Sequence, residues 1–174
     1  MPSNKSQTER SSQPKSFDAR AIQRILPHRF PMLLLDRIQV LSLTEASGYK
    51  NISANEPWFS ETVGSFPETL LIEAMAQLGG LLAVGPANYL SRMAYLSGIV
   101  TARFTGKAIP GDLLELIAMV VNLRRTAAVV TVTAQVRAET ICFAKLTYAM
   151  FDIVPDRSTP SSVKPMTKSK VSSK

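Results

Sequence analysis

The middle of the chain contains a segment that is apolar on nearly every side. Residues 70–83 read LLIEAMAQLGGLLA, and only Glu73 and Gln77 interrupt this run with strongly polar side chains. We interpret the segment as a helix. A helix without a polar face is stable in a protein only when it is buried on nearly all sides. The rest of the chain must therefore supply a layer that wraps around it.

The motif SFPE at 65–68 marks the predicted start of this helix. Ser65 and Glu68 have the spacing of a capping box, in which each side chain accepts a hydrogen bond from the backbone N–H of the other residue. Pro67 fits the first helical turn, because the N–H that it lacks would have no partner there. Many residues of this helix are alanine or glycine, so the backbone of neighbouring segments should be able to approach it closely.

Most of the remaining segments have the period and composition of β-strands. Val130, Val132 and Ala134 alternate with threonines, which predicts a strand with one buried face and one exposed face. Pro110-Gly111-Asp112 predicts a turn between two strands. The predicted strands cover 38–43, 47–53, 99–107, 113–124, 128–138 and 141–154, and a short helix is predicted at 17–26. Several antiparallel strands around one hydrophobic helix make an α+β domain.

The basic residues gather at the two ends of the chain. Of the formal charge of +7, residues 1–15 carry +2 and residues 156–174 carry +4, which leaves +1 for residues 16–155. Both ends are rich in Ser, Pro and Lys, so we expect a disordered N-terminal tail (1–15) and a basic disordered C-terminal tail (156–174) around one folded domain (16–155). Nucleic-acid binding is disfavoured, because the folded part retains almost no excess charge.

Composition also limits the chemistry that the chain can use. The single cysteine, Cys142, excludes an intrachain disulfide and a four-cysteine metal site, and its apolar neighbours favour a buried packing role. The first 20 residues are polar throughout and no stretch has the length and composition of a membrane span. We therefore expect a cytoplasmic protein with no metal and no cofactor.

Four sequence blocks occur in the order found in one enzyme family. Together the blocks resemble the 3-hydroxyacyl-[acyl-carrier-protein] dehydratases of fatty acid synthesis, over about residues 22–153. This resemblance implies a hotdog fold, in which an antiparallel sheet wraps around a long central helix. It also implies a dimer, and a substrate in which an acyl carrier protein holds a 3-hydroxyacyl or enoyl chain. The blocks are LPHRFPMLLLDR at 26–37, GYKNISANEPWF at 48–59, LIEAMAQ at 71–77, and ARF at 102–104 followed by PGD at 110–112.

The resemblance further assigns roles to individual residues. In the family, a loop histidine and a glutamate of the central helix face each other across the dimer interface and divide the work of base and acid. Glu73 matches that glutamate and is the candidate acid, and Gln77, one helical turn on, matches a supporting glutamine. The backbone at the helix N-terminus (Phe66, Pro67 and Glu68) would bind the thioester oxygen. From the residues alone, Glu73 should be desolvated and biased toward its protonated form, or else be a structural carboxyl satisfied by hydrogen bonds.

The loop histidine of the family is missing from this chain. The loop reads SETVGSFP at 60–67, and alignment from its left or right end puts Thr62 or Ser65 at the position of the base. A hydroxyl does not act as a base without an activating partner. Glu61, a water or a residue of a partner chain remain candidates. The only histidine, His28, matches a non-catalytic histidine of the family, and we assign it a structural or interface role in preference to that of a displaced base.

Three functions stay open at this point. The first is a 3-hydroxyacyl-acyl-carrier-protein dehydratase of weak or altered activity, acting as a homodimer or a higher oligomer. The second is a non-catalytic, dehydratase-like subunit that binds an acyl carrier protein or forms a heterodimer with an active paralogue. The third is a hotdog acyl thioesterase, in which one helical carboxylate directs a water. The order of the motifs favours the first, and candidate contacts for an acidic carrier are Arg29, Arg37, Arg103, Arg124 and Arg125.

Overall fold

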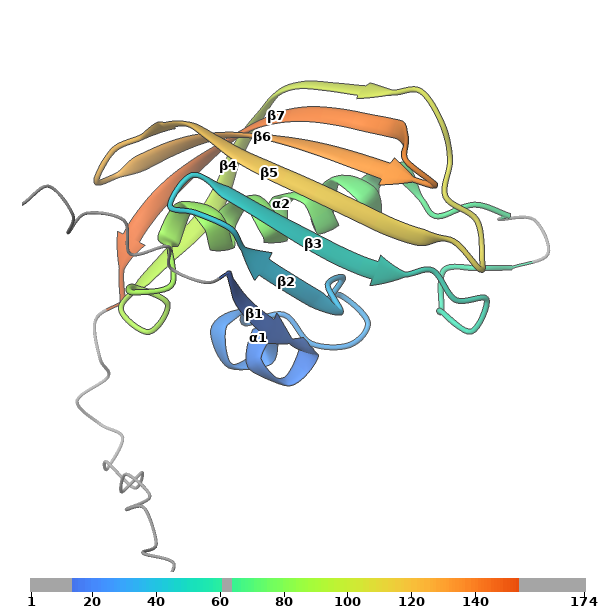
Figure 1. Cartoon of the computed structure of the whole chain (residues 1–174), viewed down its shortest axis with the longest axis horizontal. Helices are drawn as coiled ribbons and strands as arrows, with labels where there is room; N and C mark the ends of the chain where they lie inside the picture. The colour runs from blue at the N-terminus through green and yellow to red at the C-terminus, as the bar shows by residue number, and fades with distance from the viewer. Residues whose placement is uncertain (1–13, 61–63, 154–174) are drawn as a thin grey trace, which may run out of the picture.

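A curved antiparallel sheet wraps around one long helix in the computed structural model, which describes residues 14–60 and 64–153 (Figure 1). The described strands lie in the order β1-β2-β3-β5-β6-β7-β4, and each neighbouring pair is antiparallel. This is the predicted α+β arrangement. The elements are β1 (Lys15–Asp18), α1 (Ala19–Ile25), β2 (Arg37–Val40), β3 (Glu45–Asn51), α2 (Glu68–Val84), β4 (Arg92–Phe104), β5 (Leu113–Leu123), β6 (Ala127–Val136) and β7 (Glu139–Asp152).

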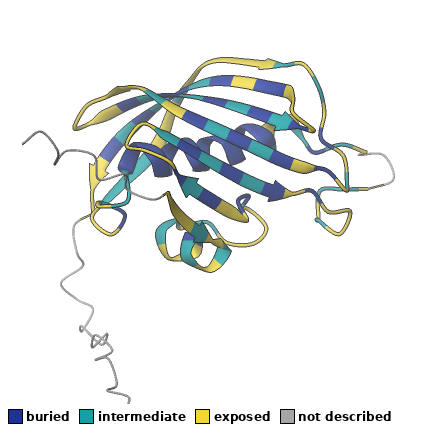
Figure 2. Ribbon diagram, in the orientation of Figure 1, coloured by how far each residue is buried: buried dark blue, intermediate teal, exposed yellow. Residues whose placement is uncertain are grey.

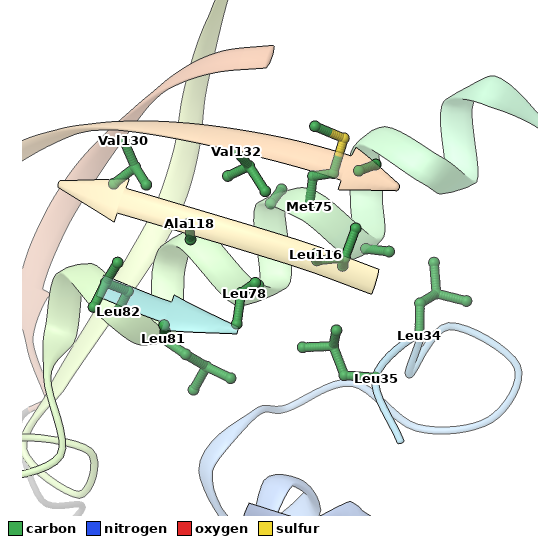
Figure 3. Packing of buried hydrophobic residues seen from close by; sticks show 14 of the residues in the cluster. Leu34, Leu35, Met75, Leu78, Leu81, Leu82, Leu116, Ala118, Val130 and Val132 are labelled. Carbon is green, nitrogen blue, oxygen red and sulfur yellow. The ribbon is translucent and has the colours of Figure 1, made fainter. Parts of the chain in front are cut away.

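Helix α2 forms the centre of the hydrophobic core, as its composition requires. Thirteen of its 17 residues are buried. Figure 3 shows side chains of α2, among them Met75 and Leu78, packed against Leu116 of β5 and Val132 of β6. Burial of a side chain of this size stabilises the fold by roughly 1.5–3 kcal/mol. The sheet therefore curves around α2 because the helix offers apolar surface on nearly all sides.

The sheet has the predicted two-residue alternation of burial. In β6, Val130, Val132 and Ala134 are fully buried against the helix, while Thr131 and Thr133 lie on the outer face and are half-buried. Figure 2 shows the same alternation as stripes along the central strands. One face of the sheet thus carries the core and the other faces outward.

One close contact explains a small residue in α2. The Tyr148 hydroxyl of β7 donates to the backbone carbonyl of Ala76 at 3.0 Å. A Cβ atom on Gly79 would lie 2.4 Å from that hydroxyl oxygen, so only glycine lets the tyrosine reach the helix. Burial raises the pKa of Tyr148, and the negative charge of Glu73 adds to this effect. The phenol therefore remains a hydrogen-bond donor.

Several predicted details need correction. Helix α2 begins at Glu68 with Pro67 as its N-cap, and no side chain caps it, so the predicted Ser65–Glu68 capping box is wrong. Strand β1 was not predicted, and it pairs with β2. Strand β4 begins at Arg92, seven residues before the predicted start at Ile99. Its first half was missed because it has no clear alternation of buried and exposed residues.

Other predictions can be compared directly with the described residues. Cys142 is fully buried, and burial, with a smaller effect from the charge of Glu68, raises the pKa of its thiol to about 11. The Pro110-Gly111-Asp112 turn is present, and Gly111 adopts a φ of 97° that favours glycine. No helix in the described ranges is long and apolar enough to cross a membrane. The predicted tails fall almost wholly outside those ranges, so their boundaries remain predictions.

Candidate active site

Glu73 and His28 meet at the surface of α2. The Nε2 atom of His28 lies 3.2 Å from the Oε1 atom of Glu73. His28 belongs to the loop between α1 and β2, and the fold brings this loop across the middle of the long helix. Their side chains keep 33% and 30% of their surface exposed, respectively, so both reach solvent while resting against the core. Glu73 is thus only partly desolvated.

Gln77 fixes the carboxyl group of Glu73 from one helical turn away. Its Nε2 atom donates to Glu73 Oε1 at 2.9 Å and to the backbone carbonyl of Met32 at 2.7 Å. Its Oε1 atom accepts from the backbone N–H of Leu34 at 3.0 Å. The amide therefore ties α2 to the loop that carries His28. Gln77 sits beside Glu73 as its spacing predicted.

A cavity of about 210 Å³ opens beside the two side chains. Most of its walls are apolar, and its polar lining includes Glu73, His28 and Arg92, the first residue of β4. Along the helix, the lining extends from Glu73 to Val84, which corresponds to about 16 Å of helical rise. The cavity is lined by residues 25–28, by residues 92–96, and by Glu73, Ala76, Gln77, Gly80 and Val84.

The helix N-terminus offers fewer backbone donors than predicted. The N–H of Phe66 is already bonded to the carbonyl of Ala108 at 2.8 Å, and proline at position 67 has no N–H. Of the three predicted residues, this leaves Glu68 alone with a backbone N–H as a candidate donor. Neither these residues nor Ser65 lines the cavity beside Glu73. Thr62 and Glu61 lie outside the described residues.

A buried ion pair holds the segment that precedes the 60–67 loop, in which the family's histidine is missing. Lys50 is 5% exposed, and its Nζ atom lies 2.6 Å from Oε1 of Glu56. The indole N–H of Trp58 donates to the other carboxylate oxygen of Glu56 at 2.6 Å. The lysine also lies over the ring of Phe66, 5.8 Å from its centre. This cluster was not predicted from the sequence, although Lys50, Glu56 and Trp58 share the motif block at 48–59.

The arrangement combines the parts needed for proton transfer on an apolar substrate. A carboxyl and an imidazole touch each other, an amide fixes the carboxyl, and an apolar cavity begins next to both. Such a pair can remove and deliver protons at one face of a bound molecule. The apolar wall can hold a hydrocarbon chain whose reactive end lies at Glu73 and His28.

Comparisons with known proteins agree with the sequence blocks. A family model described as the FabA-like domain matches residues 26–145. The 3-hydroxyacyl-[acyl-carrier-protein] dehydratase FabZ of Bacillus velezensis is 39% identical over 141 residues, which cover 77% of this chain and 98% of that protein. The bifunctional enzyme LpxC/FabZ of Chlorobaculum tepidum is 42% identical over 138 residues, 75% of this chain but only 29% of that protein.

Solved structures with low sequence identity share the fold. The dehydratase heterocomplex ApeI:P of Xenorhabdus doucetiae superposes with a TM-score of 0.65 at 20% identity, over 74% of this chain and 89% of that chain. A mutant form of thioesterase PA1618 of Pseudomonas aeruginosa gives a TM-score of 0.62 at 12% identity, over 78% and 95% of the two chains. These likenesses establish the hotdog fold.

The Gln77 amide should stabilise the protein through its bond to the buried N–H of Leu34. Substitution Gln77→Met keeps the volume but leaves that donor unpaired, so we expect the free energy of unfolding to fall by about 1–3 kcal/mol. Urea denaturation measures the change. The matched control is Gln135→Met on the outer face of β6, for which we expect a change below about 0.5 kcal/mol. Equal effects of the two substitutions would contradict the role given to Gln77.

Proposed function

Because this chain belongs to the FabA-like family of 3-hydroxyacyl-[acyl-carrier-protein] dehydratases, we propose that it interconverts 3-hydroxyacyl and enoyl thioesters held on an acyl carrier protein. The contact of Glu73 with His28 in the lining of a largely apolar cavity is the observation that carries the proposal. It supplies two proton-transfer groups at the position where the reacting end of an acyl chain would lie.

Glu73 is the proposed acid of this reaction. Dehydration needs a group that protonates the departing hydroxyl, so that it leaves as water. The carboxyl of Glu73 is held by Gln77 and opens on the cavity, which supports this role. The N–H of Glu68, at the start of the same helix, stays the proposed donor to the thioester oxygen by family resemblance. Since Glu68 does not line the cavity, the thioester would have to extend from Glu73 toward the helix N-terminus. No cofactor or metal enters this scheme.

We further propose that the protein works as a dimer in the cytoplasm. Strand β4 ends the described sheet, with β7 as its one partner there. It exposes apolar side chains along its length, including Tyr95 (56%), Ile99 (50%) and Val100 (60%). An exposed apolar edge strand favours pairing with another chain. A second copy on β4 would also lie next to the cavity, because the first residues of β4 line it.

A non-catalytic subunit is the second candidate function. The absence of a histidine from the 60–67 loop supports it. In this alternative the chain would bind an acyl carrier protein or an active paralogue without turning over substrate. A thioesterase is less well supported, because the thioesterase neighbour cited above shares the fold at only 12% identity.

Substitution Glu73→Gln tests the enzymatic proposal. We expect it to lower the turnover of 3-hydroxyacyl-carrier to enoyl-carrier by at least about 100-fold, because it removes the proton donor and little volume. The reaction is followed in both directions by mass spectrometry of the carrier. Glu139→Gln, an exposed carboxyl at the start of β7, is the control and should retain wild-type turnover.

The same assay separates the three functions. Release of free acid from the carrier would favour the thioesterase. Carrier or paralogue binding by a wild-type protein that turns over neither substrate would favour the non-catalytic subunit. Turnover that survives Glu73→Gln would contradict the proposed acid.

The proposed dimer predicts the mass of the protein in solution. Sedimentation equilibrium should give twice the 19.0 kDa of one chain, or an even multiple of it. This mass follows because, in the proposed dimer, the edge strand β4 of one chain pairs with β4 of a second chain. The mass of a single chain at micromolar concentration would contradict the dimer.

A further inference from the structure

We infer that His28 is the base that replaces the missing loop histidine, an inference that rests on the proposed dehydratase function. His28 is the only histidine in the chain. Its Nε2 atom lies 3.2 Å from the carboxyl of Glu73, and both side chains line the same cavity. This departs from the structural or interface role that the sequence alone favoured.

The backbone around His28 is held firmly enough to position the ring. The Arg29 guanidinium donates to the carbonyl of Leu26 at 2.8 Å and to the carbonyl of His28 itself at 2.7 Å. Further along the same loop, Gln77 bonds to the backbone of Met32 and Leu34. Hydrogen bonds thus hold the backbone of this loop both at His28 and further along, at Met32 and Leu34. A general base has to be presented in a defined geometry to be effective.

The imidazole of His28 makes one polar side-chain contact among the described residues. Its Nδ1 atom is buried and has no hydrogen-bond partner among the described residues. Within the described ranges, Nε2 contacts the carboxyl of Glu73, the proposed acid. The ring therefore directs its one polar contact to the reaction site.

The contact permits a complete cycle on one chain. Nε2 of His28 takes the proton from the carbon next to the thioester carbonyl, and the electron pair of that C–H bond is first held as a thioester enolate and then forms the new carbon–carbon double bond. The bond from the neighbouring carbon to its hydroxyl breaks, and the leaving oxygen takes the proton of Glu73 to depart as water. A proton then passes from Nε2 of His28 to Oε1 of Glu73 and restores both groups. One 3-hydroxyacyl thioester thus gives one enoyl thioester and one water.

This assignment changes which chains build the site. The family resemblance implies a base and an acid from two different chains. Here both side chains belong to the same chain, on the loop after α1 and on α2. A dimer would then shape the cavity without supplying the base.

The test measures base and acid steps separately. Full-length wild type, His28→Asn and Glu73→Gln are incubated in D₂O with a 3-hydroxyacyl-carrier protein. Deuterium uptake next to the thioester and conversion to the enoyl product are both followed by mass spectrometry. We expect His28→Asn to lower both rates by at least about 100-fold. Glu73→Gln should lower conversion but retain deuterium uptake, because its base is intact.

The outcomes distinguish the inference from the proposed function. If His28→Asn keeps deuterium uptake within about threefold of wild type, His28 is not the base, while wild-type turnover still supports the dehydratase. Loss of conversion with retained uptake would make His28 a positioning residue and would also overturn the inference. A wild type inactive in both directions overturns both proposals.

Two further measurements guard against trivial loss of activity. Circular dichroism and carrier binding should match wild type for each variant, and His28→Gln replaces His28→Asn if the latter does not fold. In addition, His28→Asn and Glu73→Gln chains are mixed and refolded together. Because both groups act from one chain, we expect the mixture to stay inactive. Recovery of a substantial fraction of wild-type turnover would show that they act across two chains, contrary to the inference.

Discussion

The burial of α2 on nearly all sides is the constraint on which the rest of the structure depends. Thirteen residues of this helix are buried, and all of them except Gln77 are apolar or small. They are removed from water together only if a sheet surrounds them, and the neighbouring strands β3, β5, β6, β7 and β4 form that sheet. A polar side chain on such a helix needs partners, because an unpaired polar group costs free energy in an apolar environment. Gln77 finds its partners in the backbone of the 26–37 loop, and Glu73 finds its partners in Gln77 and His28.

This requirement joins the stability of the fold to the geometry of the site. The hydrogen bonds that satisfy Gln77 also bring the His28 loop onto the helix, so the imidazole and the carboxyl meet without a separate scaffold. The cavity follows the same helix from Glu73 toward Val84, between this loop and the first residues of β4. The site thus uses one face of α2, while Met75 and Leu78 of the same helix pack in the core (Figure 3).

Periodicity in the sequence predicted most of the fold but not the central contact of the site. The apolar run of α2 and the alternation in β6 are local patterns, and both elements are present as predicted. Strand β1 has only four residues, and the first half of β4 lies at the sheet edge without clear alternation, so neither had a strong local signal. The resemblance placed Glu73 and Gln77 side by side. The contact of His28 with Glu73 depends on how the loop between α1 and β2 packs on α2. The spacing of residues along the chain does not predict this packing.

The contact between the imidazole of His28 and the carboxyl of Glu73 is the central claim, and nitrogen NMR tests it most directly. Because the chain has one histidine, selective ¹⁵N labelling gives signals from a single imidazole ring. The account predicts that the Nε2 signal shifts clearly in Glu73→Gln and stays unchanged in Glu139→Gln. An Nε2 signal that is the same in wild type and Glu73→Gln would contradict the contact, and with it the assignment of His28 to the site.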